Sequence, residues 1–254
     1  MTVCVPVAHI FRSPDRMSEH IDEILFGEKC EILEEKGDFL KIRTDYGYEG
    51  YVSVSDLSGR PYEPDFMINV PFADLLAEPK NFFRPFLSLP STARIKAFLP
   101  EENKRYAEVL LQDGKKYYIH KNLITPLNKE RLPEKALREK LVSDARDYMK
   151  APYRWGGRTF SGIDCSGLCF TVYRKNGINI WRDADPDRKG FELRKISLSE
   201  TQKGDLLFFD GHVAMCTGNN NIIHAAASRG YVWEESLDSN NYLKERLICA
   251  ATVF

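Results

Sequence analysis

The sequence predicts an α+β protein in which two small β-barrels precede a C-terminal domain of helices followed by strands. In its first half, short runs rich in Val, Ile and Tyr are broken by Gly/Asp turns, and helical spacing appears only after Pro126. The length of 254 residues suits two or three domains of about 100–200 residues each. We expect domains at residues 1–59, 60–127 and 128–254.

The two expected barrels have related sequences. LKIRTDYGYEGYVSVSDL in the first and AEVLLQDGKKYYIHKNLI in the second share apolar alternation, a turn with Asp and Gly, and an aromatic strand that ends in a polar residue and Leu. This similarity indicates an internal duplication of one barrel module. The stretch GRPYEPD at residues 59–65, rich in Pro, Gly and charge, separates the two copies.

The last domain begins with two expected helices. The first starts at Pro133, and the second covers residues 164–176, with Asp164 of a favoured N-cap type and Gly177 as a C-terminal cap. From Gly204 onward, the runs LLFF, HVAMC, NIIHAA and LICAATVF predict an antiparallel sheet. The apolar stripe of the first helix is formed by Leu137, Leu141, Ala145 and Tyr148.

The composition excludes several classes of partner. With 36 basic and 37 acidic residues and no basic run, neither nucleic acid nor an anionic membrane is an expected partner. No apolar run approaches the roughly 18 residues of a membrane span. The N-terminal MTVCVPVAHIF lacks the features of a secretion signal. Together with six scattered cysteines and no C-x-x-C pair, this predicts a cytoplasmic protein with reduced thiols, unless a leader has been removed.

Cys165 lies in the stretch GIDCSGLCF, at the expected start of the second helix. We expect the positive end of the helix dipole and a nearby imidazolium to lower its pKa from about 8.5 until the thiolate forms at neutral pH. The alternative is a small buried thiol, and Cys169, on the apolar stripe of the same helix, fits that description. The position of Cys165 after a glycine-rich loop favours a nucleophile.

A nucleophile needs a base, and His212 and His224 lie on consecutive expected strands. If the loop between them has an odd number of residues, for example 218–220, the two side chains share one face as diagonal neighbours, about 7–8 Å apart at Cα. An even loop would place them on opposite faces. We therefore predict a relay of Cys165, His212 and His224 without metal or cofactor. Zinc held by the same three residues is a weaker alternative, because a ligand pair close in sequence is missing.

Five motifs in the last domain carry a family resemblance: PYRWGG, DCSGL, KGDLLFF, GHVAM and IIHAA. In order and spacing they resemble the NlpC family of cell-wall cysteine peptidases over residues 130–254. The upstream modules look like the bacterial SH3-like domains of one branch of that family. The resemblance implies a papain-like peptidase domain in which Cys165 is the nucleophile, His212 the general base and His224 the residue that orients it.

The resemblance also implies substrate-binding residues. In WRDAD, Asp183 would help to hold a free α-amine, although this chain has Ala184 where the family often has Ser. In the first module, Glu19 and Tyr48, with Tyr51 as an alternative to Tyr48, would close one end of the groove; otherwise they are a solvated acid and barrel aromatics. Further positions that match site-lining residues are Tyr153, Asp164 and Ser166.

The branch with two SH3-like modules resembles γ-D-glutamyl-L-diamino-acid endopeptidases. This implies an enzyme of cell-wall recycling that acts on murein peptides of the form L-Ala-γ-D-Glu-diamino acid with a free N-terminal L-Ala. Separately, we expect the protein to be a monomer. The diamino acid would be diaminopimelate or Lys. Two alternatives remain at this point: a module that only binds wall peptides, and an amidase or acyltransferase that uses the same relay.

Overall fold

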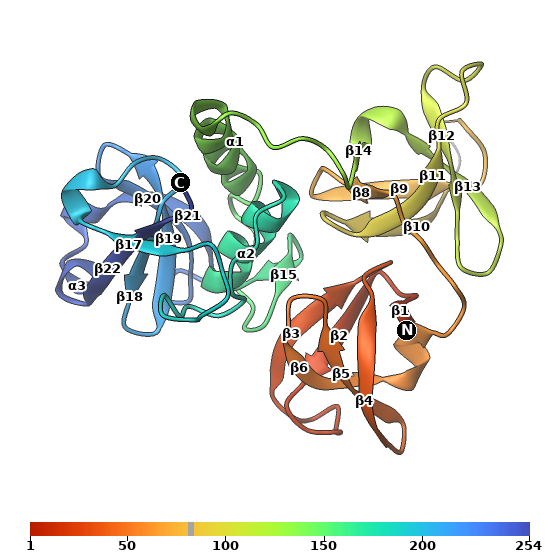
Figure 1. Cartoon of the computed structure of the whole chain (residues 1–254), viewed down its shortest axis with the longest axis horizontal. Coiled ribbons are helices and arrows are strands. Elements are labelled where there is room, and N and C mark those ends of the chain that lie inside the picture. The colour runs from red at the N-terminus through yellow and green to blue at the C-terminus, as the bar shows by residue number, and fades with distance from the viewer. Residues whose placement is uncertain (81–83) are drawn as a thin grey trace. The chain divides into compact units, whose positions relative to one another are not determined.

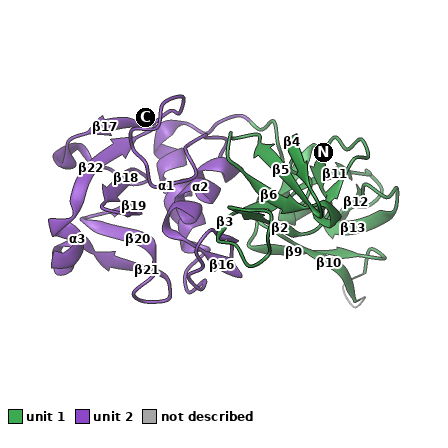
Figure 2. Cartoon of the chain, turned by 90° about the horizontal axis from the view of Figure 1, so that it is seen from below, with its two compact units in different colours: residues 1–129 green, residues 130–254 purple. Residues whose placement is uncertain are grey.

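The chain folds into two units, residues 1–129 and 130–254 (Figure 1, Figure 2). The structure is a computed structural model and describes residues 1–80 and 84–254. Unit 1 consists of strands and short 3-10 turns, whereas unit 2 combines helices with a sheet. The division falls next to the expected border between residues 127 and 128, and the division of unit 1 into two domains stays a prediction.

The N-terminal half of unit 1 is a five-stranded antiparallel sheet with the order β3–β2–β6–β5–β4, accompanied by the pair β1–β7. Side chains alternate between core and solvent, and Ala8, Ile10, Ile24, Ile42 and Val52 are fully buried inside. The elements are β1 Thr2–Val3, β2 Val7–Phe11, β3 His20–Leu25, β4 Cys30–Lys36, β5 Phe39–Thr44, β6 Glu49–Ser53, the 3-10 turn Val54–Asp56 and β7 Leu57–Ser58.

The second half of unit 1 is a seven-stranded sheet with the order β10–β9–β13–β12–β11–β8–β14. Strands β10–β9–β13–β12–β11 repeat the order β3–β2–β6–β5–β4 of the first half, and the pair β8–β14 corresponds to the pair β1–β7. In both halves a 3-10 turn precedes the last strand. The duplication expected from the sequence is therefore visible in the topology. The elements are β8 Phe66–Ile68, β9 Phe72–Leu76, β10 Pro85–Pro90, β11 Arg94–Phe98, β12 Tyr106–Leu110, β13 Lys116–His120, the 3-10 turn Lys121–Leu123 and β14 Ile124–Pro126.

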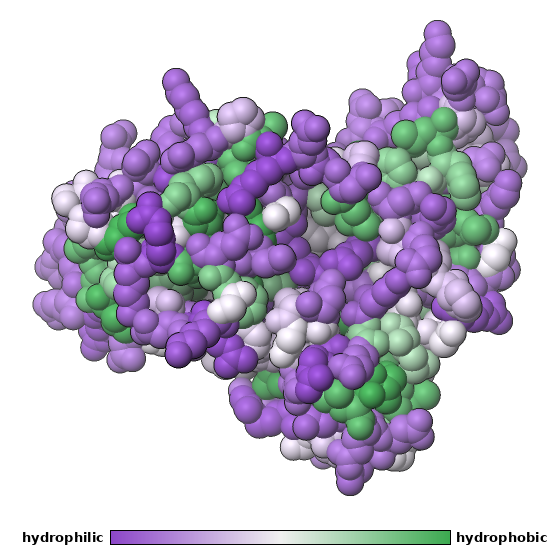
Figure 3. Space-filling model, viewed as in Figure 1, coloured by the Kyte–Doolittle hydropathy of each residue, from purple (hydrophilic) through white to green (hydrophobic). Residues whose placement is uncertain are grey.

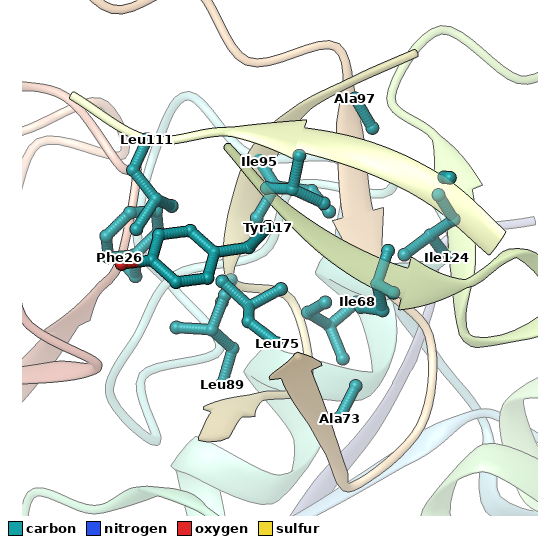
Figure 4. Packing of buried hydrophobic residues seen from close by; sticks show 14 of the residues in the cluster. Phe26, Ile68, Ala73, Leu75, Leu89, Ile95, Ala97, Leu111, Tyr117 and Ile124 are labelled. Atoms are coloured by element: carbon teal, nitrogen blue, oxygen red, sulfur yellow. The ribbon is translucent and has the colours of Figure 1, made fainter. Parts of the chain in front are cut away.

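Phe26 and Gly27 join the two halves of unit 1. Phe26 packs into the core of the second half, beside the cluster that contains Leu75 and Ile95 (Figure 4). Its carbonyl accepts a hydrogen bond of 2.7 Å from the backbone N–H of Arg94. Gly27 has a φ of +75°, and a Cβ built there would lie 1.9 Å from the carbonyl oxygen of Arg94. The position therefore requires glycine for both backbone conformation and space.

We expect Gly27→Ala to lower the free energy of unfolding of unit 1 by about 2 kcal/mol or more, because the methyl group meets backbone that cannot move aside. The matched control is Gly47→Ala, which has a φ of +83° but no atom within 4 Å of the added Cβ, so it loses only the conformational term of about 1 kcal/mol. Urea unfolding of the whole chain measures both. Equal losses would show that the close approach to Arg94 is unimportant.

Unit 2 packs helices against a six-stranded antiparallel sheet with the order β17–β22–β18–β19–β20–β21. Helix α2 spans Cys165–Lys175, within the expected range, and ends before Gly177 at a φ of +73°. Strands β18, β19, β20 and β22 match the predicted runs, whereas β17, β21 and α3 were not predicted. The elements are α1 Glu134–Arg146, β15 Arg158–Thr159, β16 Gly162–Ile163, β17 Arg194–Ile196, β18 Leu206–Phe209, β19 His212–Gly218, β20 Asn221–Ala226, β21 Tyr231–Ser236, α3 Asn241–Glu245 and β22 Leu247–Thr252.

A buried ion pair fixes α1 to α2. Lys175 Nζ lies 2.6 Å from Asp144 Oδ1, and the Asn176 side-chain amide donates to Asp144 Oδ2 at 2.8 Å. Although burial of Asp144 opposes ionisation, the charge of Lys175 and the donated hydrogen bonds keep the pKa of Asp144 below its ordinary value. The helix that carries Cys165 therefore has a rigid support.

The surface carries mostly hydrophilic side chains on the face shown in Figure 3. Within residues 1–80 and 84–254, no helix combines the length and the apolar character that crossing a membrane requires. All six cysteines are free thiols.

Candidate active site

The carboxylate of Asp164 organises the start of α2. It caps the helix by accepting from the backbone N–H of Gly167 at 2.6 Å and binds the glycine-rich turn through the N–H of Gly156 at 2.7 Å. Arg182 donates to both carboxylate oxygens at 3.0 and 3.1 Å, and its side chain is only 1% exposed. Cys165 is the first residue of the helix, directly after this cap.

The glycines at this point allow the turn and the helix to touch. A Cβ on Gly167 would lie 2.2 Å from the carbonyl oxygen of Gly157, and one on Gly157 would lie 2.3 Å from that of Gly162. Larger residues would push the turn away from the helix and move Cys165. The sequence GIDCSG therefore places the thiol at a fixed point on the first helical turn.

The hairpin of β19 and β20 brings the two histidines together. Asn219 and Asn220 form its turn with φ values of 52° and 58°, and a bulge lies just before the turn, between Cys216 and Gly218. Two turn residues plus one bulged residue give the odd count on which the prediction depended. The observed pairs, Met215 with Ile223 and Cys216 with Ile222, confirm the expected register.

The result is a direct hydrogen bond between the two rings. His212 Nε2 lies 2.8 Å from His224 Nδ1, and the ring centroids are 5.0 Å apart in an edge-to-face arrangement. The predicted placement of both histidines on one face of the sheet is confirmed.

Strand β21, which the sequence analysis missed, adds two more side chains to this face. His224 pairs with Trp233 across the sheet, and Glu235 follows two residues later on the same face. His224 Nε2 lies 3.0 Å from Glu235 Oε1 and 3.2 Å from Trp233 Nε1, and Asn240 holds Glu235 through a hydrogen bond of 2.9 Å. The alternation in YVWEES was a signal for this strand.

Cys165, His212 and His224 line one pocket of about 540 Å³ in unit 2. Tyr153 also lines it, and burial raises the pKa of Tyr153 to about 12, so that its phenol stays a hydrogen-bond donor. The charged residues on the wall are Asp210, Arg229, Glu235 and Arg246. One cavity, large enough for a small ligand, is thus lined by a cysteine thiol, two imidazoles and charged groups of both signs.

The remaining predicted site residues of unit 2 lie elsewhere around α2. Ser166 and Asp183 line a second, smaller hollow together with Cys169, and Ser166 Oγ lies 3.2 Å from Asp164 Oδ1. The carboxylate of Asp164 itself faces Arg182 and the backbone rather than the larger pocket. Their roles in substrate binding stay predictions.

Three further candidates belong to unit 1. Glu19 lies in the loop before β3 and accepts a hydrogen bond of 2.5 Å from Arg12. Tyr48 is half-buried, with its ring 6.4 Å from that of Tyr46, whereas Tyr51 lies in β6. Their roles also stay predictions.

The environment of Cys165 contradicts the expected thiolate. Burial, followed by the charge of Asp164, raises the pKa of Cys165 to about 11, although backbone hydrogen bonds and Arg182 oppose the shift. Burial and the neighbouring His224 lower the pKa of His212 to about 3. The expectation was wrong because it considered the helix dipole, which lowers the pKa of Cys165, and left out desolvation and the charge of the Asp164 carboxylate, which raise it. At neutral pH the resting protein holds a thiol and a neutral imidazole.

The geometry gives no support to zinc at this site. Within the described residues, only His9, His20 and Glu23 of unit 1 bring three potential ligand atoms within 4.8 Å of one another. His9 Nδ1 lies 3.2 Å from His20 Nε2, so these two imidazoles and a carboxylate are the residues that could hold a metal.

Comparison with known proteins identifies the family to which the chain belongs. Residues 150–252 match the NlpC/P60 family, and residues 7–58 match the bacterial SH3 domain. Dipeptidyl-peptidase 6 of Lysinibacillus sphaericus is 35% identical over 252 residues, which cover 95% of this chain and 93% of that protein. The chain belongs to the NlpC/P60 family. The family resemblance and the expectation of a cell-wall peptidase are thereby confirmed.

Other members of the NlpC/P60 family extend the similarity. The γ-D-glutamyl-L-lysine dipeptidyl-peptidase of Bacillus cereus is 29% identical over 246 residues, covering 88% of this chain and 72% of that protein. A crystal structure of an NlpC/P60 protein from the same species superimposes with a TM-score of 0.84 at 23% identity, covering 98% and 97% of the two chains. The first sheet of unit 1 is thus a bacterial SH3 domain, and unit 2 has the papain-like NlpC/P60 fold.

We expect the alkylation of Cys165 by iodoacetamide to accelerate with rising pH through the range 7 to 10 without levelling off. The reason is that only the thiolate reacts, and the pKa of Cys165 is raised to about 11. Mass spectrometry of the labelled peptide measures the rate, with glutathione as the reference thiol. A rate that is already constant between pH 6 and 8 would reveal a preformed thiolate and contradict this assignment.

Proposed function

We propose that this NlpC/P60 peptidase hydrolyses the γ-D-glutamyl–L-diamino-acid bond of murein peptides that begin with a free L-Ala. The main support is that Cys165, His212 and His224 line the same pocket and that the two imidazoles form a hydrogen bond of 2.8 Å. Relatives from two Bacillus species named γ-D-glutamyl-L-lysine dipeptidyl-peptidase support the choice of bond.

In the proposed reaction, Cys165 Sγ attacks the γ-carbonyl carbon of D-Glu while its proton passes to His212. The tetrahedral oxyanion receives hydrogen bonds from backbone N–H groups at the start of α2. His212 then donates the proton to the departing amine of the diamino acid, and the C–N bond breaks to leave a thioester. Water, deprotonated by His212, cleaves the thioester and releases L-Ala-D-Glu with the free thiol. A neutral resting imidazole suits this sequence because it can accept the first proton.

The charges around the pocket fit such a substrate. Murein peptides carry carboxylates on D-Glu and on the diamino acid, and Arg229 and Arg246 on the pocket wall offer cations to them. We propose that Asp183, and separately Glu19, recognise the N-terminal ammonium, and that Tyr48, Tyr153, Asp164 and Ser166 contribute to substrate binding. These assignments rest on the family motifs.

We further propose that residues 60–127 form a second SH3-like domain, so that the chain has domains at 1–59, 60–127 and 128–254. The support is the shared strand order of the two halves of unit 1. A requirement for a free N-terminal L-Ala selects peptides already released from the wall. On that basis we propose an enzyme of cell-wall recycling in the cytoplasm, and, as a separate proposal, that it acts as a monomer.

Replacing either of two residues should abolish turnover of L-Ala-γ-D-Glu-diaminopimelate. Cys165→Ala removes the nucleophile and His212→Ala the base, so each should reduce kcat by at least about 10³-fold. The control, Cys169→Ala, lies on the same helix outside the larger pocket and should retain most activity. Mass spectrometry detects free L-Ala-D-Glu. Undiminished cleavage by Cys165→Ala would refute the mechanism, and a product other than this dipeptide would point to the amidase or acyltransferase.

Acetylating the substrate's N-terminus should lower kcat/KM between tens- and thousands-fold. The acetyl group removes the ammonium charge. Asp183 and Glu19 are exposed in the free chain, so the cost of about 2–5 kcal/mol for losing one partner of a buried charge pair, with about 1.4 kcal/mol per decade, applies once the bound substrate shields the pair from water. Asp183→Ala and Glu19→Ala should weaken cleavage of the free peptide, and neither loss should add to that of acetylation. The control is Asp187→Ala, an exposed acid paired with Lys195. Equal cleavage of both peptides would contradict the recycling role.

A further inference from the structure

Two side chains compete for one nitrogen of the histidine pair. His224 Nε2 lies 3.0 Å from the Glu235 carboxylate and 3.2 Å from the indole nitrogen of Trp233. An ionised carboxylate can only accept a hydrogen bond, whereas an indole N–H can only donate one. His224 Nε2 must carry a proton to bind Glu235 and must lack it to bind Trp233. The two contacts therefore correspond to two different tautomers of the neutral ring.

The tautomer of His224 determines that of His212. The rings share the hydrogen bond between His212 Nε2 and His224 Nδ1, and burial lowers the pKa of both, so both are neutral. When His224 carries its proton on Nε2, its Nδ1 accepts from His212 Nε2–H, and His212 Nδ1 keeps a free lone pair. When Trp233 donates to His224, the proton moves to Nδ1 of both rings, and His212 Nδ1 can no longer accept a proton.

We propose that Glu235 is a positioning residue that selects the base-competent tautomer of His212 through His224, against the competing donor Trp233. The inference rests on the proposed function, in which His212 accepts the proton of Cys165. Glu235 is suited to this role because its side chain is only 11% exposed and because Asn240 holds the same oxygen at 2.9 Å.

The competition favours Glu235 in the native protein. A hydrogen bond to a carboxylate is roughly twice as strong as one between neutral partners. Trp233 remains near the nitrogen because the pairing of β20 with β21 places it opposite His224 and because Arg229 lies over its ring at 3.8 Å. Removing the carboxylate therefore leaves a donor that stabilises the wrong tautomer.

Nitrogen-15 NMR of the histidine-labelled full chain tests this assignment directly. In the wild type, both rings should show the proton on Nε2, and in Glu235→Ala both should show it on Nδ1. The kcat for the free murein tripeptide should fall at least tenfold, with KM changed less than threefold. Glu235→Gln, with nearly the same volume, provides a second variant if the alanine variant does not fold, and it should show a mixture of tautomers. Unchanged tautomers in the folded variants would overturn the proposal.

The double variant Glu235→Ala/Trp233→Phe separates tautomer selection from simple packing. Without the indole N–H the wrong tautomer loses its donor, so kcat should recover severalfold relative to Glu235→Ala, while Trp233→Phe alone should stay within about twofold of the wild type. Losses that add in the double variant would overturn the proposal. The matched control is Glu234→Ala, which removes the neighbouring acid on the opposite face of β21, where it binds Arg146 at 2.7 Å.

The NMR result does not depend on turnover. If Cys165→Ala proved fully active, the proposed function would fail while the tautomers could still follow Glu235. If Cys165→Ala is inactive and the tautomers do not change in Glu235→Ala, only the role of Glu235 fails.

Discussion

The buried ion pair of Asp164 and Arg182 is the contact on which the site depends. Arg182 donates to both oxygens of Asp164, to Ser166 Oγ at 2.9 Å and to the carbonyl of Gly157 at 3.3 Å. Three separate stretches of chain, the glycine-rich turn, the first turn of α2 and WRDAD, meet at this pair. An unpaired carboxylate at this depth would be strongly destabilising. Arg182 therefore permits a charged cap directly beside Cys165.

That cap has a chemical consequence for the thiol. A negative charge beside Cys165, added to burial, keeps the sulfur protonated in spite of the helix end. Proton removal then belongs to the step of attack, which makes the accepting lone pair on His212 essential. Each neutral imidazole can carry its proton on either of two nitrogens. The chain of hydrogen bonds from Glu235 through His224 to His212 is needed to fix these protons, so that His212 presents a lone pair to the nucleophile.

The sequence allowed the prediction of features that depend on local rules. Asp164 as a cap, the extent of α2 and the shared face of His212 and His224 all follow from capping preference and strand parity. The exact turn between β19 and β20 was not predictable. In place of a three-residue loop at 218–220, the hairpin has two asparagines with positive φ and a bulge. Glu235 and Arg182 were missed because their importance depends on burial and on neighbours distant in sequence. The pKa of Cys165 was misjudged for the same reason, since desolvation is a tertiary effect.

The protonated state of Cys165 also bears on oxidative damage. Peroxides oxidise thiolates to sulfenic acid and react slowly with thiols, so sensitivity follows thiolate character and exposure. Cys165 is 7% exposed and holds its proton at neutral pH. The low exposure and the raised pKa of Cys165 therefore both act to slow its oxidation relative to that of an exposed thiolate.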